Sequence, residues 1–146
     1  MFKGDRRSLL FLFGGFFILL DLLFKQLALF VFPSPVFIFG KVGWAPTLNP
    51  GIAFSIPLSN ILIIILTLIT LCFFSYLIAI EKNKNSRFGL IVATFGAISN
   101  LIDRIFYQNT IDYLQVYISV FNLADVLIVV GIGIYLLTLK QCHSER

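Results

Sequence analysis

Two polar residues stand at one end of an apolar run, "FNLADVLIVVGIGIYLL" at residues 121–137, in which Asn122 and Asp125 precede a stretch without charge. A carboxylate beside hydrocarbon is costly and needs a structural or chemical reason. Taken alone, the pair is typical of a helix start, with Asn122 as N-cap and Asp125 in the first turn. With a second carboxylate close by, Asp125 could instead share a proton and activate water against a peptide bond, as in aspartic proteases.

The candidates for that second carboxylate follow from the layout of the chain. With 146 residues, 59% hydrophobic content and 12% charge, the sequence is that of an integral membrane protein. We expect an all-α membrane protein that forms one domain over residues 1–146. Its spans are drawn at about residues 8–30, 61–80, 88–106 and 121–139.

Basic residues predict the orientation of these spans. Eight of the eleven Lys and Arg residues lie in "MFKGDRR" at the N-terminus, "EKNKNSR" at 81–87 and "KQCHSER" at the C-terminus. The positive-inside rule therefore places both termini in the cytoplasm, and this distribution argues against nucleic acid as a partner. Lys3, Arg6 and Arg7 before an apolar core could also mark a cleaved signal peptide, but no convincing cleavage site follows.

The long connection at residues 31–60 is rich in Pro and Gly and carries Trp44 among short apolar pieces. We expect a small β-structured flap at the outer membrane interface. The connection before Asn122 is short, and we expect a loop there.

The polar residues of the spans gather near the outer surface. At about 1.5 Å per residue, Asp21 lies roughly 21 Å along the first helix from Arg7. Asn100 and Arg104 lie roughly 18 and 24 Å along the third helix, and Asp125 lies about 6 Å from the outer start of the fourth. The acidic residues of this layer are Asp21, Asp103, Asp112 and Asp125.

Each of these residues also has a structural interpretation. Asp21 and Lys25 are four residues apart and could neutralise each other, and Asp103 could pair with a basic side chain. Asn100 and Arg104 share a helix face and could fix helix packing. For Asp112, in the expected outer loop, the alternative is ordinary solvation.

Other chemistries lack the residues they need. The single histidine, His143, lies in the C-terminal tail, so no Ser/His or Cys/His pair is expected in the outer layer. Cys72 and Cys142 fall at different levels, so we expect no disulfide, no metal site and no cofactor.

The ordered motifs "DLLFK" at 21–25, "NPGIAF" at 49–54, "NLIDR" at 100–104, "IDY" at 111–113 and "FNLAD" at 121–125 resemble the lipoprotein signal peptidases, or type II signal peptidases. The resemblance covers nearly the whole chain. It implies a monomeric aspartyl endopeptidase of the bacterial inner membrane, active near the periplasmic face. Such an enzyme cuts prolipoproteins before a diacylglyceryl-modified cysteine, contacts membrane lipid and binds globomycin-type inhibitors.

The resemblance also implies roles for residues. It makes Asp112 and Asp125 the catalytic pair. The remaining matched residues would bind substrate or support the site: Asp21, Lys25, Asn49, Gly51, Asn100, Asp103, Arg104 and Asn122.

The chain departs from the family pattern at a few positions. Ser99 falls in a stretch where glycines are usual, Tyr113 replaces a usual Phe, and Ser119 replaces a usual Pro. These departures bear on loop geometry and substrate preference more than on the reaction.

Two other functions remain open at this point. Intramembrane carboxylates also form ion relays, as in a small transporter or proton channel, although the inner halves of the expected helices offer no polar path. The aspartates of a non-catalytic subunit would serve packing and capping alone.

Overall fold

The computed structural model describes residues 6–52, 56 and 58–144, with side chains from residue 12 to residue 140. Its helices are α1 (Arg6–Gln26), continued by the π-helical segment η1 (Leu27–Val31), α2 (Asn60–Ile80), α3 (Lys84–Tyr107) and α4 (Leu123–Ser144). Each of the four contains a stretch long and apolar enough to cross a membrane, and these helices lie within a few residues of the predicted spans.

Two helix starts differ from the prediction, and capping explains both. Asn83 accepts hydrogen bonds from the backbone N–H groups of Asn85 and Ser86, so α3 begins at Lys84, inside the segment expected to be a connection. The fourth helix begins at Leu123 and not at residue 121, because Phe121 ends a strand and Asn122 caps the helix.

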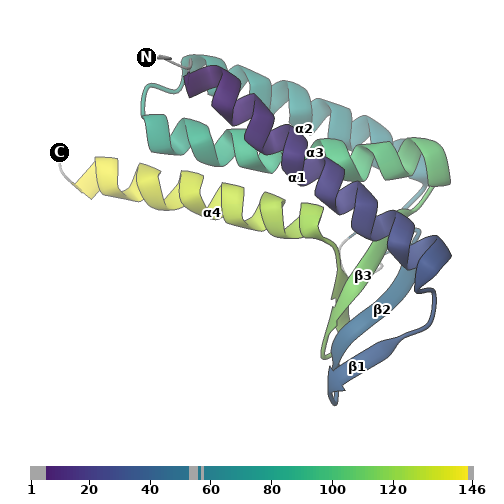
Figure 1. Ribbon diagram of the computed structural model, residues 1–146. Helices are drawn as coiled ribbons and strands as arrows, with labels where there is room; N and C mark the ends of the chain where they lie inside the picture. Colours follow the sequence, from purple (N-terminus) through teal and green to yellow (C-terminus); the bar gives the residue numbers. More distant parts are fainter. Residues whose placement is uncertain (1–5, 53–55, 57, 145–146) are drawn as a thin grey trace.

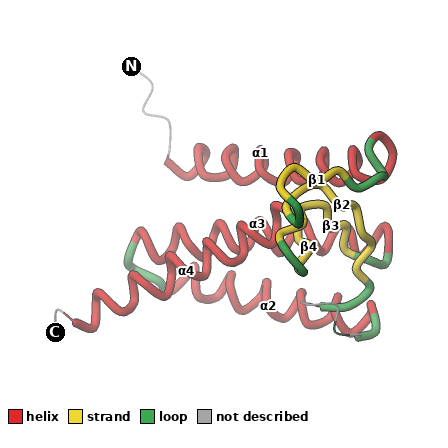
Figure 2. Tube along the Cα trace, turned by 90° about the horizontal axis from the view of Figure 1, so that it is seen from below, coloured by secondary structure: helices red, strands yellow, loops and turns green. Residues whose placement is uncertain are grey.

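Helix α3 is central and packs against the other three helices (Figure 2). Its contact with α4 is close because small residues meet there, with Gly89 and Ala93 of α3 against Gly131 of α4. A Cβ atom built on Gly131 of α4 would lie 2.5 Å from the Gly89 carbonyl oxygen and 2.5 Å from the Ala93 nitrogen. The backbones of α3 and α4 therefore touch where only glycine fits.

The outer connections form one antiparallel sheet in the order β1-β2-β3-β4. Its strands are β1 (Val36–Phe39), β2 (Val42–Asn49), β3 (Thr110–Val116) and β4 (Ser119–Phe121). The predicted flap is confirmed in β1 and β2, although residues 53–55 and 57, including Ala53 and Phe54 of "NPGIAF", lie outside the described residues. The prediction of a loop around Asp112 is wrong, because Asp112 lies on β3, which pairs with β2 of the flap.

A bulge in β2 sets the register that matters for Asp112. Trp44 pairs with Leu114, whereas three residues later Thr47 pairs with Asp112, so one extra residue is accommodated between them. Pro46 lies inside this interval and has no N–H to donate, and bulges are among the few sheet positions that tolerate proline.

The sheet is fastened to the end of α1. Tyr113 is buried with Ala28 and Ile111, and its ring contacts those of Phe24 and Trp44. The Trp44 indole also donates to the Phe32 carbonyl oxygen at 2.9 Å.

Figure 1 shows the start of α1, the end of α4 and the connection between α2 and α3 at one end of the helices, with the sheet at the other. All four helices therefore run between a sheet end and an end that carries both chain termini.

We expect Gly131→Ala to lower the melting temperature in detergent, because the new methyl group would meet the backbone of α3. The control is Gly133→Ala, two residues along the same helix, where nothing lies within 4 Å of a built Cβ. That change should leave the protein unaffected or stabilise it by up to about 1 kcal/mol. Equal melting temperatures for the two variants would contradict the close α3–α4 contact.

Candidate active site

The start of α4 is built by a reciprocal pair of hydrogen bonds. The Asn122 Oδ1 atom accepts from the Asp125 backbone N–H at 2.9 Å, and Asp125 Oδ2 accepts from the Asn122 backbone N–H at 3.2 Å. This is a capping box, which satisfies two backbone donors at a buried helix end. The capping interpretation of the sequence is therefore confirmed, and it leaves Asp125 Oδ1 free for another partner.

Asp112 lies on β3 and is 3% exposed, so the alternative of a solvated loop residue is wrong. Its two oxygens accept from side-chain amides: Oδ1 from Asn122 Nδ2 at 2.8 Å and Oδ2 from Asn49 Nδ2 at 3.0 Å. Asn49 is fixed in turn, because its Oδ1 accepts from the Gly51 backbone N–H at 3.0 Å. The flap thus contributes directly to the environment of Asp112.

Asn100 completes the set of donors. Its Nδ2 donates to Asp125 Oδ1 at 2.8 Å, and its Oδ1 accepts from Asn122 Nδ2 at 3.1 Å. Each of the four oxygens of Asp112 and Asp125 therefore accepts one N–H hydrogen bond, from α3, from the start of α4 or from the flap. Such donors favour the ionised form of a carboxyl group.

Burial and like charge oppose these donors. Burial first, and then the charge of Asp125, raise the pKa of Asp112 from 3.8 to about 6. Two carboxyl groups that repel each other in this way hold one proton between them over part of the pH range. One can then accept a proton from water while the other donates a hydrogen bond, which is general acid–base chemistry close to neutral pH.

A cluster of buried ions lies beside this pair. Lys25 Nζ is 2.6 Å from Asp21 Oδ2 and 2.8 Å from Asp103 Oδ2, and all three side chains are fully buried. The structural interpretation of these residues, ion pairing within and between helices, is confirmed. The same ammonium group also donates to Asn100 Oδ1 at 3.1 Å, so the ion cluster contacts the donor network of Asp125.

Two further hydroxyl groups bind Asp21 and were not among the predicted site residues. Ser99 Oγ donates to Asp21 Oδ2 at 2.7 Å, and Tyr113 Oη donates to Asp21 Oδ1 at 2.9 Å. Burial raises the pKa of Tyr113, so it remains a hydroxyl donor. The sequence signal for both was their departure from the family pattern, which gave no indication of a shared partner.

Arg104 reaches the flap and not the carboxylate pair. Its guanidinium group donates to the carbonyl oxygens of Pro50, at 3.0 Å, and Gly51. Arg104 is 4% exposed and fixes the segment that follows Asn49. It therefore positions the flap over the site.

A cavity of about 320 Å³ opens at the carboxylate pair. Its polar end is formed by Asn49, Asn100, Arg104, Asp112 and Asp125. The remaining lining comes mostly from apolar side chains of α2 and α4: Ile63, Leu66, Phe74, Ile128 and Ile132. The cavity is thus polar beside the carboxylates and apolar along the helices.

All ten predicted site residues gather around the sheet ends of α1, α3 and α4. Asp112, Asp125, Asn49, Gly51, Asn100 and Arg104 line the cavity, Asn122 links the two carboxylates, and Asp21, Lys25 and Asp103 form the buried ion cluster behind them. Within residues 6–52, 56 and 58–144, no three His, Cys, Asp or Glu side chains are grouped as metal ligands would be.

Known proteins match this chain in sequence. A family model described as "Signal peptidase (SPase) II" matches residues 14–141. The lipoprotein signal peptidase of Bartonella quintana is 48% identical over 94 residues, which cover 58% of this chain and 56% of that protein. That of Bartonella henselae is 45% identical over 94 residues, or 58% of each chain. This chain thus matches little more than half the length of these relatives.

A solved structure matches the fold over a longer range. It is described as a bacterial membrane enzyme, and it covers 95% of this chain and 92% of its own with a TM-score of 0.87. The sequence identity is 20%, so this likeness shows that the two chains share a fold.

We expect Asp112→Asn to stabilise the protein more at pH 7.5 than at pH 4. Because the folded pKa of Asp112 is about 6, above its ordinary 3.8, the stability of the wild type falls as the pH rises from about 4 to about 6 and then stays level. The amide does not titrate, so the variant escapes this loss, which is about 3 kcal/mol at most.

Thermal unfolding of both proteins in the same detergent at the two pH values measures this effect. An identical difference between the melting temperatures of variant and wild type at pH 4 and pH 7.5 would mean that Asp112 titrates as an ordinary carboxyl group.

Proposed function

Since the chain belongs to the signal peptidase II family, we propose that it is an aspartyl endopeptidase that removes signal peptides from prolipoproteins, cutting before a diacylglyceryl-modified cysteine. The observation that carries this proposal is the pair Asp112 and Asp125. Four N–H donors hold its four oxygens at the polar end of a cavity that is otherwise largely apolar.

In the proposed reaction the two carboxyl groups share one proton. The ionised member takes a proton from water as the water attacks the scissile carbonyl carbon, and the protonated member donates a hydrogen bond to the carbonyl oxygen. A tetrahedral intermediate forms without a covalent bond to the enzyme. The raised pKa of Asp112 supports this assignment, because a carboxyl group with a pKa near 6 exchanges protons readily near neutral pH.

The lining of the cavity supports the proposed substrate class. A signal peptide is apolar and the acyl chains of a modified cysteine are apolar, so both suit the walls supplied by Leu66, Phe74 and Ile132. The bond to be cut is more polar and would lie at the carboxylate end. Asn49 and Arg104 are within reach of the substrate main chain there, and we assign them to binding and to holding the flap.

We infer the orientation from charge. The start of α1, the end of α4 and the 81–87 segment lie at the end of the helices opposite the sheet (Figure 1). Six of the eight basic residues counted in the sequence belong to these described parts: Arg6, Arg7, Lys82, Lys84, Arg87 and Lys140. The positive-inside rule then puts that end in the cytoplasm and the carboxylate pair near the periplasmic face of the inner membrane.

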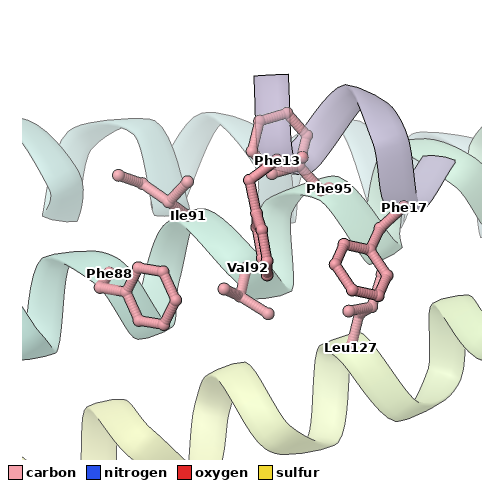
Figure 3. A pocket seen from close by; sticks show the side chains of 8 residues that line it. Phe13, Phe17, Phe88, Ile91, Val92, Phe95 and Leu127 are labelled. Carbon is pink, nitrogen blue, oxygen red and sulfur yellow. The ribbon is translucent and has the colours of Figure 1, made fainter. Parts of the chain in front are cut away.

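The alternative of a proton or ion pathway finds less support. Phe13, Phe17 and Phe88 fill the space between α1, α3 and α4, with Leu127 facing them from α4 (Figure 3). The space among these side chains is about 10 Å³, which is barely enough for one water molecule, and its lining is entirely apolar. A chain of waters or polar groups would have to avoid this region.

We expect Asp112→Asn and Asp125→Asn each to reduce cleavage of a diacylglyceryl-modified prolipoprotein by at least about 1,000-fold, because neither variant retains a proton-sharing carboxyl pair. Purified proteins in detergent, followed by gel shift on the lipidated substrate and on its unlipidated counterpart, measure this. The wild type should cut the lipidated substrate alone, and a globomycin-type cyclic peptide should inhibit it.

The matched control is Glu81→Gln, a carboxylate-to-amide change at the C-terminal end of α2, away from the carboxylate pair. This variant should cut like the wild type. Melting temperatures report whether each variant is folded. If the wild type left the lipidated substrate intact while an active relative cut it, or if a folded Asp112→Asn variant cut normally, the peptidase assignment would be wrong.

A further inference from the structure

Lys25 is a buried cation that contacts the donor network of the carboxylate pair without contacting the pair itself. Its ammonium group is fully buried, and its three shortest contacts are to Asp21 at 2.6 Å, Asp103 at 2.8 Å and the side-chain oxygen of Asn100 at 3.1 Å. A longer hydrogen bond of 3.5 Å goes to Ser99 Oγ. The first two contacts neutralise charge. The third contact is directed at a neutral amide, and the ion cluster does not need it for neutralisation.

We propose that Lys25 is a positioning residue that holds the Asn100 amide in the orientation that presents its N–H to Asp125. The proposal rests on the peptidase function proposed above, in which Asp125 must ionise.

The orientation of this amide is determined by what faces each end. Asn100 Oδ1 faces two donors, Lys25 Nζ and Asn122 Nδ2, and Asn100 Nδ2 faces Asp125 Oδ1 at 2.8 Å. Turning the amide over would place its NH2 group against an ammonium group and its oxygen against a carboxylate oxygen. Both contacts are repulsive while Asp125 is ionised.

Without Lys25 only Asn122 Nδ2 would hold the amide oxygen, and that nitrogen already donates to Asp112 Oδ1 at 2.8 Å and to the Ile111 carbonyl oxygen at 3.3 Å. The turned amide would then place its oxygen against Asp125 and accept a hydrogen bond from the protonated acid. Removal of Lys25 therefore favours the inactive state in which both carboxyl groups are protonated.

Other charged groups face this network and must be held constant in a test. Asp21 comes from α1, Asp103 and Arg104 from α3, Asp112 from β3 and Asp125 from α4. The Tyr113 hydroxyl faces Asp21 from β3. At full ionisation the ion cluster of Asp21, Lys25 and Asp103 carries one net negative charge.

The double variant Lys25→Met/Asp103→Asn keeps that net charge and removes the contact to Asn100. Asp21 retains three donors in it: the hydroxyls of Ser99 and Tyr113 and the Ala124 backbone N–H at 3.3 Å. Position 103 tolerates an amide, because Asp103 Oδ1 has no hydrogen-bond partner and only Oδ2 accepts from the Ile111 backbone N–H at 3.2 Å.

The wild type has the same net charge as the double variant and is the charge-matched control. The single variant Asp103→Asn, which keeps Lys25 and its bond to Asn100, controls for the amide at position 103. Lys25→Gln/Asp103→Asn serves as a second test variant, since glutamine offers a neutral donor to the buried groups. Melting temperatures in detergent establish which variants are folded.

Relative both to the wild type, whose ion cluster has the same net charge, and to Asp103→Asn, we expect the double variant to show a kcat at least about 10-fold lower on the lipidated prolipoprotein. Its KM should stay within about threefold, because a fully buried Lys25 cannot touch substrate. The acid limb of its pH–rate profile should move up by about one pH unit, since the pair has lost a hydrogen bond to its ionised form.

Infrared titration gives a reading that does not depend on turnover. The carboxyl C=O band that is missing from Asp125→Asn should disappear at a higher pH in the double variant than in the wild type and in Asp103→Asn. If a folded double variant matches the wild type in kcat and in this titration, Lys25 only neutralises charge and the inference is wrong. A wild type that cuts no lipidated substrate would overturn the peptidase function, and the infrared titration would still decide the role of Lys25.

Discussion

Charged groups held away from water need partners within the protein, and the packing of α1, α3 and α4 at their sheet ends satisfies that requirement. Lys25 of α1 lies between the carboxylates of Asp21 and Asp103, and so joins α1 to α3. Asp21 also accepts from the Ala124 backbone N–H, which joins α1 to α4. A buried ion pair contributes little net stability, but removal of one partner leaves an unpaired charge, so these helices have one favourable arrangement. That arrangement brings Asn100 within 2.8 Å of Asp125.

The sheet supplies the second half of the site, and the buried polar groups there also need partners within the protein. Asp112 is on a strand whose neighbour carries Asn49, and the bulge around Pro46 sets the register that lets the two side chains meet. Arg104, which points from α3 into the flap, satisfies the carbonyl groups of Pro50 and Gly51. At the carboxylate pair itself, side-chain amides and a guanidinium group therefore join the flap, α3 and the start of α4.

Much of this could be predicted from the sequence because the signals are local. Apolar runs of about 20 residues mark the spans. The motifs "NLAD" and "NLIDR" mark a polar layer near the helix ends that were predicted to be outer. The strand β3 could not be found in this way, since its partner β2 lies some 65 residues earlier and the ladder with β2 makes it a strand. The strand β4 in turn pairs with β3. The hydroxyls of Ser99 and Tyr113 were likewise invisible as a pair, because nothing in the sequence shows that both reach Asp21.

Helix α2 differs from the other spans in how little of it the protein covers. Only 6% of its apolar membrane-spanning stretch is buried within the protein, against 50% for α3. A bilayer thinner or thicker than the apolar length of the spans acts first on the helix with the fewest protein contacts, by changing its tilt. Leu66 and Phe74 of α2 line one wall of the cavity. The carboxylates belong instead to β3 and α4, and the close contact at Gly131 holds α4 against α3. Bilayer thickness would therefore adjust the width of the cavity while the spacing of the two carboxylates stays the same.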